Sequence, residues 1–565
     1  MSLFSSLQLA GNTLNAAQVG IQVTGNNIAN ASTPGYLRQE LVLTPAQTQK
    51  KGDLLLGTGV QISGVVQKID KFLESRLHTA NSDLANGATQ EAAYRELELV
   101  LGELSDTDLS TALTNFFGSI QDVLNQPEST AVRNLSVLEG QKLADDIRRL
   151  YGRVDDLRVN LNQQVASSSD DINRLLKDVA DLNFKIVSIE GGATSRSDAV
   201  GLRDQRQIAL TELSGLISIR AVEQEDGQVT VFTGGDFLVF DSQYRKVETV
   251  YEEKNGISAA QIQIVETAKK IDDSSGQLAG LTESRDNILG GFLTQLDDFA
   301  SQLISEFNKS FSQGQGLSGY GSITSEFAVE NAELPLDQAG LAFTPTNGSF
   351  ALQVKNKQSG VTNTTDIQID LDGLDQDTSL SDLAAALNAV DGVTAKVSPS
   401  RKLEITSDSP DIEFAFSGDN SGVLAALGVN HFFSGTGAGS ININQTIRKD
   451  PGLFAASSGG VGVDTANAEK LASLLDRSLP SADGKSLAEI YDRLAANTSQ
   501  GASVSRAVAD GFRVFQQTLD NQKLSISGVN LDEEAINLIT YQRAYQASAR
   551  YISTVSDLLD VLVNL

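Results

Sequence analysis

Apolar residues at both ends of the chain recur at alternating steps of four and three positions. This spacing is the a/d pattern of a coiled-coil helix. The N-terminal series is Leu3, Leu7, Ala10, Leu14, Ala17, Ile21, Thr24 and Ile28, and the C-terminal series is Ala535, Leu538, Gln542, Tyr545, Ala549, Ile552, Ser556, Leu559 and Val563. Alanine and polar residues interrupt both series, so either helix alone is marginally stable in water. We expect each end to be poorly ordered until it packs against the opposite terminus, a neighbouring subunit or both. An ordinary helix pair within one monomer is the alternative.

The middle of the chain has no proline between Pro127 and Pro335, which permits long helices because proline disrupts helix interiors. Two series with the coiled-coil spacing flank the polar residues 167–169, and eleven residues from Leu161 to Ile172 are expected to shift the supercoil phase. The first series is Leu143, Ile147, Leu150, Val154, Leu157 and Leu161, the second is Ile172, Leu175, Val179, Leu182, Ile186 and Ile189, and a third is Leu289, Phe292, Leu296, Phe299, Leu303 and Phe307. Helices are expected again from Ala466 to Leu475 and on to the C-terminus.

Strand patterns occupy two other regions. Residues 228–232 and 237–240 are β-rich runs separated by Gly234 and Gly235, which predicts a hairpin. From Gly348 the runs SFALQVK, DIQIDLD, VTAKVS, KLEITS and EFAF predict strands, and SLSDLAAALNAV predicts a helix.

These patterns predict a multidomain α+β protein with a terminal helical coiled-coil domain, a long helical bundle in the middle, and small β-rich and α+β inserted outer domains. The predicted domains are residues 1–60 with 525–565 as a terminal coiled coil, disordered in the monomer; 61–200 with 278–320 and 447–524 as a helical bundle; 201–277 as a small β-rich domain; and 321–446 as an inserted, variable α+β outer domain.

Composition narrows the function. The 43 basic and 72 acidic residues give a net charge of −29, which disfavours nucleic-acid binding. No stretch is apolar enough to predict membrane insertion. The first basic residue is Arg38, so a Sec-type signal peptide is not expected. Cysteine is absent, and the absence suits a chain that must stay unlinked while unfolded.

A glycine string, Gly314, Gly316 and Gly319, matches the dinucleotide pattern G-x-G-x-x-G. It follows a predicted helix and precedes a Ser/Gly-rich segment, whereas the dinucleotide motif follows a strand and opens a helix. We therefore expect no cofactor there.

An acidic run, Asp370, Asp372, Asp375 and Asp377, resembles a calcium loop at first sight. If Gly373 is the sixth position, Gln368 and Ser379 occupy the first and twelfth, so both essential carboxylates are missing. A solvated turn is the preferred interpretation, with weak cation binding as the lesser alternative.

The two histidines, His78 and His431, are 353 positions apart and have no recognisable nucleophile beside them. A zinc protease motif needs two histidines four positions apart. The sequence therefore predicts no catalytic residue, no metal site and no enzyme activity.

The most specific motifs lie near the two ends. Residues 26–30 read NNIAN and lead into STPGY at 32–36, where Thr33 and Pro34 end the first helix and Gly35 permits a positive φ. This turn, with Asn30 and Tyr36, resembles the N-terminal signature of flagellar rod, hook and hook-associated proteins, although Ser32 stands where asparagine is frequent. Arg38 and Gln39 resemble the hook-associated protein 1 branch. Further motifs of that family are SGVNLDEEA at 527–535, YQRAYQA at 541–547, GTGV at 57–60, DQR at 204–206, GQLAGL at 276–281 and RD at 285–286.

The resemblance covers most of the chain except about 322–446, where the role of the outermost domain stays open. It implies a non-enzymatic subunit that joins the flagellar hook to the filament, is secreted through the flagellar type III channel and resides outside the cell. Implied partners are sister subunits in a ring, hook protein, the second hook-filament junction protein and a cytoplasmic export chaperone at the C-terminal region.

On this interpretation the terminal series form the assembly interface. The residues that we expect to carry it are Leu3, Leu7, Leu14, Ile21, Ile28, Leu538, Tyr545, Ile552, Leu559 and Leu562. Three alternatives remain: another axial subunit such as a distal rod protein or flagellin, an enzyme carried in the insert, and a junction protein whose insert adds an adhesin role.

Overall fold

The computed structural model describes residues 3–51, 54–102, 109–191, 197–254, 256–272, 274–374 and 376–563. The chain forms two compact units. Unit 1 comprises Met1–Ala93, Val159–Asp286 and Ser503–Leu565, and unit 2 comprises Tyr94–Arg158 and Asn287–Ala502. The predicted four-domain division stays a prediction. No helix in the described ranges combines the length and apolar character needed to cross a membrane.

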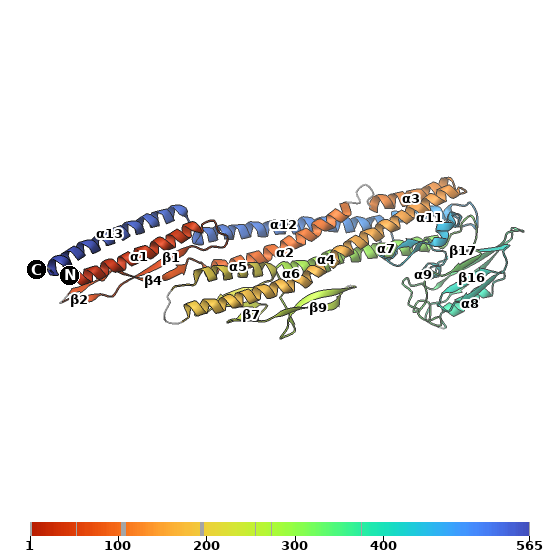
Figure 1. Cartoon of the computed structure of the whole chain (residues 1–565). Coiled ribbons are helices and arrows are strands. Elements are labelled where there is room, and N and C mark those ends of the chain that lie inside the picture. The colour runs from red at the N-terminus through yellow and green to blue at the C-terminus, as the bar shows by residue number, and fades with distance from the viewer. Residues whose placement is uncertain are drawn as a thin grey trace. The chain divides into compact units, whose positions relative to one another are not determined.

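In unit 1 the two terminal helices lie side by side, with both chain ends at the same end of the pair (Figure 1). They are α1 (Leu3–Ala29) and α13 (Leu531–Val563), which confirms a helix at each terminus. A long antiparallel hairpin of β1 (Gln39–Pro45) and β4 (Val60–Gln67) contacts α1, and β2 (Gln49–Lys51) pairs with β3 (Leu54–Leu56) at its tip.

Three long helices contain residues of both units: α2 (Lys71–Gly102), α4 (Thr130–Glu190) and α12 (Leu487–Ser527). The helix α4 continues through the polar residues 167–169 that separate the two apolar series. Ser168 Oγ donates to Gln164 O at 2.8 Å and Ser169 Oγ to Ala166 O at 2.9 Å, so the serines bond back to the helix. Unit 1 also contains α5 (Val200–Leu216), α6 (Gln277–Glu283) and the π-helix Ser284–Leu289, which ends across the boundary in unit 2.

The small β-rich part of unit 1 has two antiparallel sheets. One has the order β5-β6-β7-β8 and the other β11-β10-β9. Their strands are β5 (Arg220–Glu223), β6 (Val229–Thr233), β7 (Asp236–Phe240), β8 (Gln243–Tyr244), β9 (Val247–Lys254), β10 (Ile257–Ile264) and β11 (Lys269–Lys270). The predicted hairpin across Gly234 and Gly235 is therefore confirmed. Ile172, Leu213 and Val231 belong to one buried apolar cluster, so α4, α5 and the sheets share a core.

Unit 2 has a phenylalanine-rich core between helices. Besides parts of α2, α4 and α12, its helices include α3 (Leu109–Asn125), α7 (Gly290–Phe311), α9 (Val423–Leu427), α10 (Gln445–Lys449), α11 (Ala466–Ala472) and the 3-10 segments Pro451–Leu453, Ser473–Leu475 and Pro480–Ala482. Phe116 contacts Phe307 at 5.2 Å between ring centroids, and Phe432 contacts Phe433 at 4.9 Å. Both predicted helices, 289–307 and 466–475, are confirmed in outline.

The remainder of unit 2 is an α+β region, as predicted from Gly348 onward. Its sheets have the orders β14-β13-β17, β12-β16-β15 and β18-β19. The elements are β12 (Ser322–Thr324), β13 (Gly348–Asn356), β14 (Thr362–Ile369), α8 (Leu380–Asn388), β15 (Val393–Val397), β16 (Leu403–Ser407), β17 (Ile412–Ser417), β18 (Phe433–Ser434) and β19 (Asn442–Ile443). Ser379 and Asp382 form a capping box that starts α8.

The glycine string has a packing role. A Cβ on Gly314 would lie 2.2 Å from Asn467 Nδ2, and a Cβ on Gly316 would lie 2.4 Å from Gly452 O. The segment follows α7 and leads to no helix, so it lacks the context of a dinucleotide loop.

Candidate assembly site where the two ends of the chain meet

The turn after α1 is built by its own polar side chains. Asn30 Nδ2 donates to Asn26 O at 3.0 Å, and the backbone N–H of Thr33 donates to Asn30 O at 2.9 Å. Gly35 has φ of 78°, and a Cβ there would lie 2.7 Å from the Ile208 side chain. The turn motif thus requires glycine at this position both for its backbone and for space.

Asn27 joins this turn to the following strand. Its amide is 1% exposed and pairs with the backbone of Gln39, donating to the carbonyl at 2.9 Å and accepting from the N–H at 3.0 Å. Tyr36 donates its hydroxyl proton to Asn27 Oδ1 at 2.8 Å. Burial raises the pKa of Tyr36 to about 12, helped by the charges of Asp204 and Glu534. The turn is therefore fixed to β1 by buried hydrogen bonds.

The C-terminal motif completes the same site. Asn27 Nδ2 donates to Glu534 Oε2 at 3.2 Å, although the two residues are 507 positions apart in the sequence. Arg38 Nε donates to Glu534 Oε1 at 2.8 Å, and Arg38 also pairs with Glu533 at 2.7 Å. We name Asn27, Arg38 and Glu534 the terminal clamp. It joins the start of β1 and the end of α1 to the first turn of α13.

The electrostatics of the terminal clamp favour the charged pair. The Glu534 side chain is 2% exposed, whereas Glu533 is 57% exposed. Burial alone lowers the pKa of Arg38, but hydrogen bonds and charges of Glu533 and Glu534 outweigh it and raise the pKa. Asn530 Oδ1 accepts from the N–H of Asp532 at 3.0 Å, and carboxylates in this first turn complement the helix dipole. The acidic run after Asn530 therefore both starts α13 and holds Arg38.

Small side chains line the contact between α1 and α13. The buried residues of α1 are Ser6, Ala10, Ala16, Ala17, Gly20, Thr24 and Asn27. On α13 the buried residues are Glu534, Ser548 and Val555. A Cβ on Gly20 would lie 2.7 Å from the ring of Tyr541, so this glycine allows the two helices to approach closely. The buried line shares Ala10, Ala17 and Thr24 with the predicted series, and each of its other members is adjacent in sequence to a member of that series.

The residues expected to form the assembly interface lie at the margins of this contact. Leu3, Leu7, Leu14, Ile21, Ile28, Leu538, Ile552 and Leu559 are half-buried, and Tyr545 is 39% exposed. The Leu562 side chain lies outside the described part of the chain. Considerable apolar surface therefore stays accessible on the helix pair, and its use in assembly stays a prediction.

A polar cavity of about 210 Å³ lies beside the clamp. It is lined by α1, β1 and α13, through Gly20, Val23, Thr24, Asn27, Arg38, Gln39, Glu40, Leu41, Lys68, Glu534, Asn537 and Tyr541. Five of these residues, Asn27, Arg38, Gln39, Glu534 and Tyr541, belong to the motifs of the two termini. The N-terminal and C-terminal motifs therefore meet at one place in the fold.

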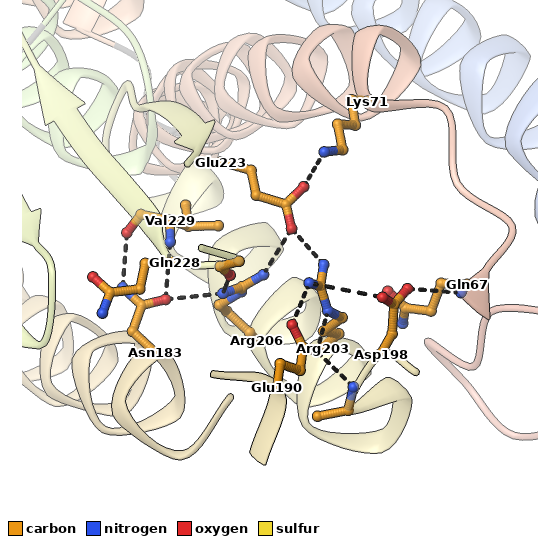
Figure 2. Close-up of polar contacts among 12 residues, drawn as sticks. Gln67, Lys71, Asn183, Glu190, Asp198, Arg203, Arg206, Glu223, Gln228 and Val229 are labelled. Atoms are coloured by element: carbon orange, nitrogen blue, oxygen red, sulfur yellow. Dashed lines mark hydrogen bonds and ion pairs between the residues drawn. The ribbon is translucent and has the colours of Figure 1, made fainter. Parts of the chain in front are cut away.

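A second polar network surrounds the DQR segment at the base of the β-rich part (Figure 2). Arg203 binds Glu190 through two hydrogen bonds of 2.7 and 2.6 Å, and Glu223 bridges Arg203 to Lys71. The pKa values of the Glu190 and Glu223 carboxyls are lowered, because the paired arginine and lysine side chains outweigh the effect of burial. The network ties α2, α4 and α5 to β5.

Arg206 extends the same network. It donates to Asn183 Oδ1 at 2.9 Å and to Gly227 O at 2.7 Å, and burial lowers its pKa to about 10. Asn183 in turn pairs with both backbone groups of Val229, as Figure 2 shows. These links join the helices α4 and α5 to each other and to the sheet, and none has the geometry of a nucleophile activated by a base.

The histidines and the acidic run were the remaining chemical candidates. His78 and His431 are both buried, and burial lowers the pKa of each to about 4. Asp370, Asp372 and Asp377 bring ligand oxygens within 4.8 Å of one another at an exposed turn, and Asp375 lies outside the described residues. Asp372 and Asp377 accept backbone N–H groups of that turn, at 2.9 and 3.0 Å. The carboxylates of Asp372 and Asp377 therefore stabilise the turn.

Comparison with known proteins finds flagellar proteins that match along most of the chain. The model of the flagellar hook-associated protein FlgK helical domain matches residues 94–326, that of the flagella basal body rod protein matches 7–36, and that of the flagellar basal body rod FlgEFG protein C-terminal region matches 521–565. Flagellar hook-associated protein 1 of Escherichia coli K12 is 26% identical over 98% of both chains. That of Bacillus subtilis 168 is 25% identical over 100% of this chain and 98% of the relative. The chain is therefore similar to flagellar hook-associated protein 1 along almost its whole length.

A solved structure agrees with this fold. The flagellar hook junction protein FlgK from Burkholderia pseudomallei superposes with a TM-score of 0.50 at 15% identity, covering 80% of this chain and 100% of that chain. The two rod-protein models match the segments that contribute Asn27 and Glu534. Both motifs are visible in the sequence, but their pairing is not; the polar Asn27 on a helix and the acidic turn after Asn530 are the signals that point to it.

Proposed function

We propose that this chain is a structural subunit at the junction between the hook and the filament of the bacterial flagellum. Similarity to hook-associated protein 1 along almost the whole chain is the observation that carries the proposal. The terminal clamp supports it, because it joins the two ends into one paired element whose leucines keep accessible apolar surface. Apolar surface of this kind is buried when subunits polymerise.

The terminal helices are then the elements that assemble. In the free subunit the pair of α1 and α13 buries little apolar surface, because its leucines are half-buried and its contact is made of small side chains. The two ends therefore order fully only against neighbouring subunits. The proposed partners are sister subunits in a ring, hook protein and the second hook-filament junction protein. A cytoplasmic chaperone holds the C-terminal region before type III export to the cell exterior.

The proposed role is mechanical and not enzymatic. The charged side chains of the DQR network are paired with one another, and both histidines are buried. An activity screen of the full chain that found turnover abolished by a point substitution in unit 2 would contradict this part of the proposal.

The alternatives drawn from sequence are less well supported. The rod-protein models match only the ends, whereas the FlgK helical domain model matches 94–326, so a distal rod or flagellin-like subunit is not favoured. An added adhesin role of the insert is not favoured either.

Electron microscopy of a null mutant tests the function. We expect hooks without filaments, and filament protein shed into the medium. A chain lacking residues 1–28 is expected to keep a folded unit 2 but to fail to restore filaments, whereas the full chain restores them. Normal filaments on either mutant would overturn the proposal.

A further inference from the structure

One face of α12 in unit 1 is exposed and carries no charge. Between residues 503 and 527 its outward positions include Val504, Val508, Val514, Phe515 and Ile526, with exposed fractions of 57%, 46%, 65%, 45% and 37%. The positions between them on this face are alanine, glycine, threonine, asparagine, glutamine and serine, and all are exposed. At about 100° per residue the face covers an arc of about 140°. We name it the α12 stripe.

The charged residues of the same segment lie elsewhere on the helix. Arg506, Asp510, Arg513, Asp520 and Lys523 all fall outside that arc. Arg513 pairs with Asp510 and Glu91, and Lys523 pairs with Glu74 at 2.8 Å. A helix surface that faces solvent ordinarily carries charged side chains. In a chain of net charge −29, the absence of any charged residue from the stripe therefore indicates a surface that a partner covers.

The start of α2 extends this surface with an arginine. Arg76 has its guanidinium carbon 5.9 Å from the ring centroid of Phe72 and 5.8 Å from that of Phe515. Phe72 is 73% exposed. Within the described residues no carboxylate lies within ion-pair distance of Arg76, so two aromatic faces hold a cation that faces solvent. Arginine between aromatic rings is the composition of interface hot spots.

We infer that the α12 stripe, with Phe72 and Arg76, binds a second copy of this chain. Two copies that each carry −29 repel, and they pack most readily where one surface has no negative charge. The unpaired Arg76 complements an acidic partner, and a second copy is acidic. The inference rests on the proposed function, because copies of the chain meet in the proposed ring. The α12 stripe would then form a lateral contact between neighbouring copies, in addition to the contacts of the terminal helices.

A pair of matched variants tests the stripe. Phe515→Asp places a carboxylate in the stripe, whereas Gln517→Asp places one at an exposed position on the charged side of the same helix. Each variant is expressed in otherwise normal cells, and circular dichroism of the secreted chain checks that its melting curve is unchanged. Mass spectrometry then counts the copies of each variant in isolated hooks. We expect about a tenfold loss of Phe515→Asp per hook, and less than about a twofold loss for Gln517→Asp. Equal incorporation of the two variants would overturn the inference.

A crosslink identifies the occupant without disturbing the fold. A photoreactive phenylalanine analogue at position 508 of the full chain, irradiated in assembled hooks, is expected to give an adduct in which both peptides come from this chain. An adduct only with a different flagellar protein would overturn the inference, as would no adduct at all. Absence of the unmodified chain from the hooks would instead refute the proposed function, which keeps the two failures distinct.

Discussion

The helix pair at the chain ends and the core of unit 2 are packed in opposite ways. In unit 2, rings such as Phe116, Phe307 and Phe432 are fully buried and contact one another. Between α1 and α13 the contact is made of alanine, serine and glycine and is fixed by buried polar groups at one end. Unit 2 therefore draws its stability from its own core, whereas the terminal pair leaves apolar surface for other chains.

The largest effect is expected in the aromatic core. Phe307→Ala removes a ring with 0% exposure that contacts five other phenylalanines. We expect the free energy of unfolding of unit 2 to fall by about 3–5 kcal/mol, because transfer and cavity costs add. Denaturant titration measures it, and amide exchange of α1 and α13 should be unchanged. A loss below about 1 kcal/mol would show that the core is not the source of stability in unit 2.

The next effect is expected in the terminal clamp. Glu534→Ala leaves Arg38 with only the exposed Glu533 and leaves the buried Asn27 amide without one acceptor. We expect a loss of about 2–3 kcal/mol in the local stability of α13, measured by hydrogen exchange. Glu533→Ala is the control and should cost less than about 1 kcal/mol, since the Glu533 side chain is itself solvent-exposed. Equal effects of the two substitutions would show that the buried Glu534 stabilises α13 no more than the exposed Glu533 does.

The helix contact itself is tested by glycine. Gly20→Ala forces a methyl group against Tyr541, and we expect a cost of about 1–3 kcal/mol to the pairing of α1 with α13. Gly11→Ala meets no atom within 4 Å on the same helix and should be neutral or stabilise α1 by up to about 1 kcal/mol. Exchange rates of the α1 amides separate these outcomes. A stabilising Gly20→Ala would mean that the helices do not approach so closely.

At neutral pH the smallest effect is expected from the two histidines, one in each unit. Both have a pKa of about 4 in the folded chain against an ordinary value near 6.5, because burial disfavours the imidazolium. Between these values the unfolded chain binds more protons, so the free energy of unfolding of each unit falls as the pH falls from about 6.5 to 4. NMR of the two imidazoles should show no titration near pH 6.5. Normal titration of either would contradict its burial.

Much of the fold follows from local pattern. The hairpin at Gly234 and Gly235 and the strands from Gly348 are predictable because alternation and turn residues act over a few positions. The continuity of α4 through Ser168 and Ser169 is harder to predict, since it depends on side chains that bond back to the helix.

The terminal clamp was not predictable from either motif alone. Asn27 and Glu534 are separated by 507 positions, and only tertiary packing brings them together. The buried line of α1 keeps Ala10, Ala17 and Thr24 of the predicted series. It has Ser6, Gly20 and Asn27 in place of their larger neighbours Leu7, Ile21 and Ile28. Hydrophobicity favoured the leucines, whereas close helix approach selected the smaller side chains.

On this proposal the paired terminal helices pack against neighbouring subunits during assembly, whereas the buried aromatic core of unit 2 does not change. Hydrogen exchange of residues 3–28 and 535–559, compared between the secreted monomer and isolated hooks, tests it most directly. The account predicts weak protection of both segments in the monomer, strong protection in the hooks, and no change for the amides of α3 and α7. Equal protection of the two terminal segments in monomer and hooks would contradict it.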